Sequence, residues 1–292
     1  KLGRPRLFFG ISAGAMDSMV NHYTANRRRR SDDAYTPGGR AGQRPDYPTI
    51  VYADALKRLF PDVPIVAGVA HYDYWQDRLR PSIMADSQAD IIIYGMGEKP
   101  VIEVADALNA GRSIDELTSI PQTVVRRPLS EIPAATDAHN VVLHPYEECL
   151  RSKRCQAENF KYVEVESNRW NGRDLWQATG DVAIKVNRTN PPTEEIDASF
   201  DLPYTRLPHP RYNGKRIPAY EMIRHSVNMH RGCFGGCAFC TISAHQGKFI
   251  ASRSKRSIMR EVDQVTHMDD FKGYISDLGG PSANMYSLHG RD

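Results

Sequence analysis

The residues with the clearest chemical potential are three cysteines within eight positions, Cys233, Cys237 and Cys240. Their spacing is C-x3-C-x2-C, with glycines at 232, 235 and 236 and no fourth cysteine nearby. Thiolates are soft ligands that suit iron–sulfur clusters and zinc. Glycines allow tight backbone turns, so the three sulfurs could converge on one small inorganic group. Metal sites built from cysteine usually have four protein ligands, so the missing fourth ligand needs an explanation.

An iron–sulfur cluster explains the missing ligand. Three cysteines around a [4Fe–4S] cube leave one iron open to a substrate or cofactor, just as an open position makes a zinc site catalytic. The alternative is a structural zinc site with His230 or His245 as the fourth ligand, although such sites usually pair C-x2-C with a second, distant pair. We expect His230 to end a strand or to lie beside the cluster rather than to bind metal.

Composition indicates a globular protein of a reducing compartment. The 292 residues are 40% hydrophobic and 25% charged, and they contain neither a membrane-length apolar run nor the apolar core of a signal peptide. The net charge of +3 is too small to indicate nucleic acid by itself. Five cysteines do not fit a secreted disulfide framework, so we expect a cytoplasmic location, no membrane partner, and ordinary free thiols at Cys149 and Cys155.

The first third of the chain alternates short apolar runs with helical patterns. Strands are predicted over 6–12, 63–68, 91–94 and 122–127, and helices over 15–24, 50–60 and 100–110. The continuous apolar run at 91–94 is typical of a strand covered on both faces. This alternation predicts an α/β fold with a mostly parallel, doubly wound sheet. We assign residues 1–120 to this Rossmann-like domain.

The rest of the chain divides into a connecting region and a second domain. Residues 121–220 are rich in proline, with short strands predicted at 161–167 and 182–187. Residues 221–292 follow the order strand, loop, helix and strand, with the helix over 254–267. That order predicts the opening βαβ unit of a truncated (β/α) barrel, in which chemistry collects at the C-terminal ends of strands. The cysteines and Gly279–Gly280 follow the two strands, so we expect them to face the same mouth.

The stretch CFGGCAFC matches the CxxxCxxC motif of radical S-adenosylmethionine (radical SAM) enzymes, including the aromatic Phe239 before the last cysteine. Further stretches resemble the YgiQ family of uncharacterised radical SAM proteins: SVNMHRGCFGGCAFC, RIPAYEMI, GYISDLGGPSANMY, MVNHYTANRRRRSDDAYTPGG and AHYDYWQDRLRPSI. They are spread over nearly the whole chain. The fold that this resemblance implies is a cobalamin-binding-type Rossmann domain followed by a radical SAM partial barrel.

The resemblance also implies cofactors and site residues. Cys233, Cys237 and Cys240 would bind a [4Fe–4S] cluster, and the methionine part of S-adenosylmethionine (SAM) would occupy the fourth iron. Reductive cleavage of SAM would give a 5′-deoxyadenosyl radical that abstracts hydrogen from an unknown small or macromolecular substrate. Phe239 would lie near the adenine. Gly279 and Gly280 would bind the SAM amino group, although Pro281 replaces the usual acidic residue. An electron donor such as flavodoxin or ferredoxin is the implied partner.

Two other functions stay open. A radical SAM methyltransferase or methylthiotransferase acting on RNA or protein would need cobalamin or further cysteines. The D-x-H-x-x-G signature of cobalamin binding is absent, so we do not expect that cofactor. A zinc-stabilised nucleic-acid-binding module without catalysis is the non-enzymatic alternative, and it predicts strongly salt-dependent binding.

Several polar or aromatic stretches have both a structural and a functional interpretation. For Arg27–Arg30 we favour a solvated segment over a substrate-anion or nucleic-acid site, and for His71–Gln76 packing over a substrate pocket. Gly95–Glu98 opens a helix and could present amides to an anion. Asp277 could point to the barrel mouth or hold a loop. No catalytic residue is assigned.

Overall fold

The computed structural model describes residues 3–12, 19–67, 78–189, 196–237, 240, 242–280 and 284–288, without the side chains of Val20, Ala244 and His245. The chain forms two compact units. The first consists of residues 1–19 and 45–190, and the second of residues 20–44 and 191–292. These units group the residues differently from the predicted ranges 1–120, 121–220 and 221–292.

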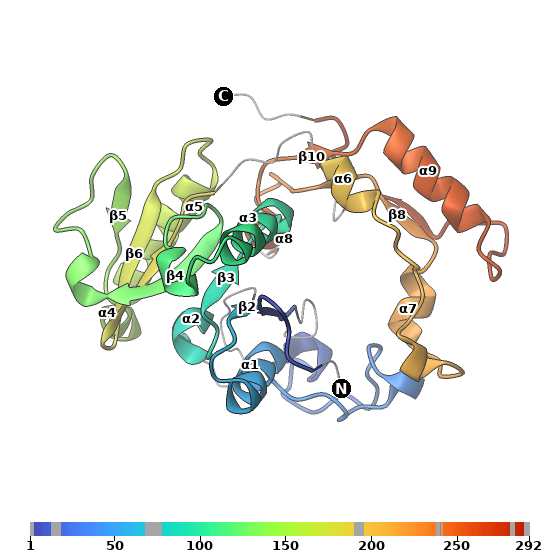
Figure 1. Ribbon diagram of the computed structural model, residues 1–292, viewed down its shortest axis with the longest axis horizontal. Helices are drawn as coiled ribbons and strands as arrows, with labels where there is room; N and C mark the ends of the chain where they lie inside the picture. The colour runs from blue at the N-terminus through green and yellow to red at the C-terminus, as the bar shows by residue number, and fades with distance from the viewer. Residues whose placement is uncertain are drawn as a thin grey trace. The chain divides into compact units, whose positions relative to one another are not determined.

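A seven-stranded mixed sheet forms the centre of the first unit, with strand order β1-β2-β3-β4-β7-β6-β5 (Figure 1). The strands are β1 (Phe9–Gly10), β2 (Ile65–Ala67), β3 (Ile91–Ile93), β4 (Thr123–Pro128), β5 (Asn140–Val142), β6 (Asp174–Thr179) and β7 (Val182–Val186). β1, β2 and β3 are parallel, β4, β7 and β6 follow as antiparallel neighbours, and β5 pairs with β6 in parallel. The α/β prediction is confirmed, but the sheet is mixed rather than mostly parallel.

Helices cover both faces of this sheet because its central strands are apolar on both sides. On one face, Ile65 and Ile92 pack with residues of α1 (Pro48–Leu59) and α2 (Ile83–Asp86). On the other, Val66 and Ile91 pack against α3 (Glu98–Asn109). Successive residues of one strand thus enter opposite cores, as the two-residue period of a strand requires. The predicted helices at 50–60 and 100–110 are confirmed.

The predicted strand at 161–167 is wrong, because these residues form the last turns of α5 (Lys153–Ser167). Valine alternating with glutamate is typical of a strand, yet Tyr162 and Val163 are exposed. The buried residues of α5 are the polar Asn159 and Glu166, which are hydrogen-bonded to the chain around them. Polar burial of this kind leaves no apolar helical period to detect. α5 lies against the short helix α4 (Tyr146–Arg151).

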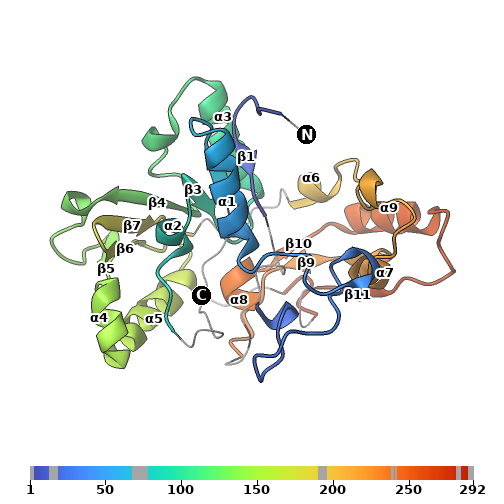
Figure 2. The same ribbon diagram turned by 90° about the horizontal axis from the view of Figure 1, so that it is seen from below.

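The second unit contains the βαβ element predicted from the sequence. β8 (Ser226–Asn228) and β11 (Asp277–Gly279) are parallel neighbours, and α9 (Lys255–Thr266) lies between them in the sequence. Figure 1 labels β8 and α9, and Figure 2 labels β11 and α9. Val227 of β8 packs against Ile258 and Val265 of α9 in a small core. The Ser254 side chain caps α9 by accepting a hydrogen bond from the Ser257 N–H, at 3.1 Å.

Shorter elements complete the second unit. They are β9 (His230–Arg231), β10 (Ala251–Ser252), α6 (Ile196–Phe200), α7 (Pro218–Ile223) and α8 (Ile242–Gln246). Short 3-10 helices occur at Met19–Asn21, Pro37–Gly39, Ile114–Glu116, Leu129–Glu131 and Pro210–Tyr212. Residues 20–44 join this unit through backbone hydrogen bonds from Ala219 to Ala34 and from Gly38 to Arg216. No described helix has the length and apolarity needed to cross a membrane.

Candidate functional site

The cysteine loop is an excursion between two paired strands. Arg231 of β9 opposes Ala251 of β10 in antiparallel register, and the Cys233 N–H donates to the Gly247 carbonyl at 3.0 Å. Between them, Gly232 has φ +87°, and a Cβ at this position would lie 2.0 Å from the Phe249 carbonyl oxygen. Only glycine fits such a close backbone approach. The two ends of the cysteine loop are therefore held close together, where the backbone of Gly232 meets that of Phe249.

Two of the three thiols border the same small space. A Cβ at Gly235 would lie 3.4 Å from Cys233 Sγ, 3.7 Å from Cys237 Sγ and 3.8 Å from Met285 Cε. The Cys240 N–H donates to the Cys237 carbonyl at 3.0 Å, which turns the loop back on itself. Cys233 is buried, Cys240 is half-buried and Cys237 is exposed, and all three are free thiols. Glycine at 235 thus leaves room between sulfur atoms that belong to different turns of the loop.

The spacing of the sulfurs distinguishes a cluster from a single ion. A tetrahedral zinc with Zn–S bonds of about 2.3 Å brings its sulfurs to about 3.8 Å from one another. Among the described residues, no set of three ligand atoms lying within 4.8 Å of one another includes any of the three cysteines. A cluster of several atoms holds its cysteines farther apart than one ion does. The donor set, three free thiols of which Cys233 and Cys237 border one glycine-lined space, is of the type that binds iron–sulfur clusters.

His230 connects the cysteine strand with the glycines after β11. Its side chain is fully buried, and Nε2 accepts a hydrogen bond from the Met285 N–H at 3.1 Å. A Cβ at Gly280 would lie 1.8 Å from the same Nε2. An acceptor nitrogen cannot carry a proton, so this imidazole is neutral with its proton on Nδ1. His230 is the first residue of β9 rather than the last residue of the strand before it, and its Nε2 accepts a backbone hydrogen bond.

The C-terminal ends of β8 and β11 lie side by side. The Met229 N–H, just after β8, donates to the Gly279 carbonyl at 2.7 Å. The strands run parallel, so the segment leading to the cysteines and the Gly279–Gly280 pair leave the sheet at the same end. Asp277 is exposed and near Gly279, with Oδ1 3.3 Å from the position of a Cβ there. The C-terminal ends of these two parallel strands are thus neighbours.

A buried arginine fixes the end of β8 to α9. The Arg253 guanidinium donates to the Asn228 carbonyl at 2.8 Å and to the Ser257 carbonyl at 3.0 Å, and it forms an ion pair with Glu261. It also lies over the Phe200 ring, 4.3 Å from the centroid. Arg206 forms a second ion pair with Glu261. The end of β8 is therefore held by charge-assisted hydrogen bonds from Arg253 as well as by its pairing with β11.

Arg231, just before the cysteine loop, places another guanidinium against the Phe200 ring. Its guanidinium lies 4.9 Å from the Phe200 centroid, and burial lowers its pKa from the ordinary value. Phe200 therefore contacts two arginines, and the cysteine loop begins directly after one of them.

Some predicted residues lie outside the described part of the chain. They are Phe239, Pro281 and His71–Gln76, together with the side chain of His245. Residues Arg27–Arg30 form an exposed turn, with an antiparallel bridge between Tyr23 and Arg29. At the Gly95–Glu98 loop, Gln122 Nε2 donates to the carbonyls of Tyr94 and Met96 at 3.0 and 3.2 Å, so a protein side chain occupies this turn.

A protein-family model described as "Radical SAM N-terminal" matches residues 1–226. This match covers most of the chain. The chain belongs to the radical SAM superfamily, in its UPF0313 or YgiQ-type family. The predicted family is confirmed.

Curated relatives of this radical SAM protein support the same family. A UPF0313 protein of Porphyromonas gingivalis is 62% identical over 304 residues, covering 100% of this chain and 48% of the relative. One from Bacteroides thetaiotaomicron is 57% identical, covering 100% and 50%, and one from Geobacter sulfurreducens is 47% identical, covering 99% and 49%. The chain thus spans about half the length of the curated relatives it matches. No solved structure gives a significant match.

Sequence reasoning missed Met285 as a neighbour of the cysteine loop. Its N–H binds His230, and its methyl group faces the space at Gly235. The Tyr286 hydroxyl donates to the Arg253 carbonyl at 2.9 Å, which ties the same segment down. The residues after a glycine pair have no characteristic pattern, so no sequence signal identified this contact.

Proposed function

We propose that this chain is the cluster-binding part of a radical SAM enzyme, with Cys233, Cys237 and Cys240 as ligands of a [4Fe–4S] cluster. The observation that carries the proposal is that the Cys233 and Cys237 thiols border the same small space at Gly235, with Cys240 turned back towards Cys237 by a backbone hydrogen bond. When bound, the cluster supplies the single electron that cleaves the sulfonium of SAM.

The residues of the chain would bind and orient this chemistry. The close contact between Gly232 and Phe249 fixes where the cysteine loop begins. His230, at the start of β9, contacts Gly280. Gly279 and Gly280 would present backbone groups to the SAM amino group from the same mouth. The βαβ unit of β8, α9 and β11 would open the radical SAM partial barrel, whose strand ends collect the cofactor groups.

For the first unit we propose a Rossmann-like domain without cobalamin. Helices cover both faces of its sheet, as in doubly wound folds. The electron donor in this proposal is a flavodoxin or a ferredoxin. The reducing, cytoplasmic location is likewise proposed from the free thiols.

Anaerobic reconstitution with iron and sulfide tests the proposal. We expect about four irons and four sulfides per chain and the electron paramagnetic resonance spectrum of a reduced [4Fe–4S] cluster, changed by added SAM. Cys237→Ala should abolish the cluster, since two thiolates cannot hold it. Cys149→Ser is the matched control, and it should retain the full iron content.

Two results would contradict the proposal. One is a colourless protein that takes up a single zinc ion at the three cysteines instead of iron. The other is an unchanged cluster in Cys237→Ala. The zinc result would restore the alternative of a zinc-stabilised nucleic-acid-binding module, whose RNA affinity should fall steeply with salt.

A further inference from the structure

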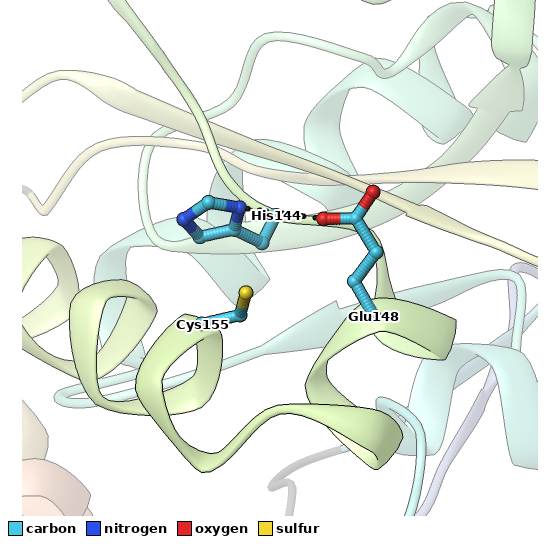
Figure 3. A group of neighbouring side chains, drawn as sticks. All are labelled: His144, Glu148 and Cys155. Carbon is cyan, nitrogen blue, oxygen red and sulfur yellow. Dashed lines mark ion pairs between the residues drawn. The ribbon is translucent and has the colours of Figure 1, made fainter.

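A second cluster of metal-ligand side chains lies in the first unit, formed by His144, Glu148 and Cys155. Each offers one ligand atom, and the three atoms lie within 4.8 Å of one another. Figure 3 shows a ring nitrogen of His144 facing a carboxylate oxygen of Glu148. The Cys155 sulfur points towards these two side chains. Nitrogen, carboxylate oxygen and thiolate sulfur together are the ligand types of zinc sites.

The three side chains come from neighbouring turns of the chain. His144 follows β5, Glu148 lies on α4, and Cys155 lies in the first turn of α5. Only Ser152 separates the two helices, and its hydroxyl caps α5 by accepting from the Cys155 N–H at 3.3 Å. This cap fixes the helix turn from which the thiol projects.

A buried amide holds the backbone of His144. The His144 N–H donates to Asn159 Oδ1 at 2.8 Å, and Asn159 Nδ2 donates to the His144 carbonyl at 3.0 Å. Gln177 Nε2 donates to the same carbonyl at 3.1 Å. Asn159 is only 4% exposed, so this clamp is shielded from water. The position of the imidazole is thus set before any ligand arrives.

Glu158 fixes the orientation of the imidazole. Its Oε2 lies 2.8 Å from His144 Nε2, and its Oε1 accepts from Arg154 Nε at 2.9 Å. Arg154 and His144 thus contact the two oxygens of the same carboxylate, which places Glu158 as the hydrogen-bond acceptor for Nε2. Nε2 therefore carries a proton, which frees the Nδ1 lone pair for a ligand. Metal-binding histidines usually donate their other N–H to a carboxylate in this way.

The Nδ1 atom faces a second carboxylate. Nδ1 of His144 lies 3.5 Å from Glu148 Oε2. One ion could contact both atoms across this distance, since zinc binds nitrogen and oxygen at about 2.0–2.2 Å. The nearby thiol adds the soft ligand that zinc accepts.

We propose that His144 Nδ1, Glu148 and Cys155 bind a zinc ion, with Glu158 orienting the histidine. The Cys155 thiol loses its proton to solvent on binding, as metal thiolates require. Three protein ligands leave the fourth tetrahedral position to water. The ion would join the segment after β5 to both α4 and α5. The site is independent of the cluster proposed for the second unit.

Cobalt titration tests this site directly. The background is a variant with Cys233, Cys237 and Cys240 all changed to Ser, which removes the other cysteine-rich site. We expect one Co²⁺ per chain with the near-ultraviolet charge-transfer absorption of a cobalt–thiolate bond, displaced by one equivalent of Zn²⁺. Cys155→Ser on this background should abolish the absorption, and Glu158→Gln should weaken affinity by roughly 10–100-fold. Cys149→Ser changes a buried thiol nearby, and it should retain both the charge-transfer absorption and the Co²⁺ affinity.

Three other results would contradict the proposed zinc site. These are no saturable Co²⁺ binding, unchanged absorption in Cys155→Ser, or loss of absorption in Cys149→Ser alone. Circular dichroism without metal shows whether each variant is folded. If Cys155→Ser is unfolded, Glu148→Gln replaces it, because the Glu148 side chain is 54% exposed and its change should spare the fold. Unchanged affinity in that variant would equally reject the proposal.

Discussion

Gly280 lies directly against the imidazole of His230, so closely that a Cβ on Gly280 would fall 1.8 Å from Nε2. The same nitrogen accepts the Met285 N–H at 3.1 Å. One fully buried ring thus joins three segments: the strand before the cysteines, the glycine pair after β11, and the segment that covers the loop. The contact explains a need for glycine at 280 that is independent of any cofactor.

Gly280→Ala should therefore destabilise the second unit. The new methyl group must displace a buried ring that has no room to move, and such overpacking typically costs about 1–3 kcal/mol. Urea unfolding followed by circular dichroism measures the loss. Gly279→Ala is the matched control, because its Cβ would meet only the exposed Asp277 carboxylate at 3.3 Å. Equal stability of the two variants would contradict the steric interpretation.

Arg253→Met should cost about 3–5 kcal/mol of unfolding free energy. The Arg253 side chain is fully buried, and its loss leaves Glu261 with one arginine partner in a site that is 14% exposed. Removing one member of a buried ion pair is costly in this way because the remaining charge stays desolvated. Arg256→Met serves as the control, since Arg256 is exposed on α9 and its change should stay within about 0.5 kcal/mol. Similar losses in both variants would show that burial of Arg253 is not the cause.

Glu166→Gln should make stability less dependent on pH in the acid range. Burial alone raises the pKa of Glu166, but hydrogen bonds from the Arg173 side chain and backbone, together with the charges of Arg173 and Arg169, lower it overall. A depressed folded-state pKa means that the carboxylate stabilises the fold above the unfolded value of about 4.3 and that this contribution is lost as pH falls through the folded value.

Unfolding curves between neutral and acid pH measure this effect for Glu166. We expect the wild type to exceed Glu166→Gln by about 1–3 kcal/mol at pH 7, with the gap closing below about pH 4. Glu116→Gln is the control, because its ion pair with Arg112 is exposed and contributes little. A gap that is constant with pH would reject the assignment.

Sequence patterns predicted the parts of the fold that depend on apolar periodicity. Ile91–Ile93 and the helix after Pro100 were identified because apolar burial is visible in residue types. α5 was missed because its buried residues, Asn159 and Glu166, are polar and satisfied by contacts far along the chain. Long-range hydrogen bonds of this kind leave no local signature.

The candidate sites divide along the same line. The motif C-x3-C-x2-C is local, so spacing alone indicated the cluster ligands. Cys155 is a free thiol, as predicted, but its nearness to His144 and Glu148 arises only from the fold. His144 and Glu148 are four residues apart and offered a weak helical signal, but β5 ends just before His144 and only the structure shows where its ring points.

Gly235→Ala should separate cluster binding from folding. Without a cluster, the added Cβ would make ordinary contacts at 3.4 Å to Cys233 Sγ and 3.7 Å to Cys237 Sγ, so the melting temperature of the iron-free protein should change little. With a cluster, the same methyl group would occupy the space between the sulfurs, and iron per chain should fall at least several-fold after reconstitution. Gly236→Ala has open space at its Cβ but φ +61°, so it should lower stability by about 1 kcal/mol while retaining iron. Full iron content in Gly235→Ala would mean that the cluster lies elsewhere and that the space at Gly235 is not part of its site.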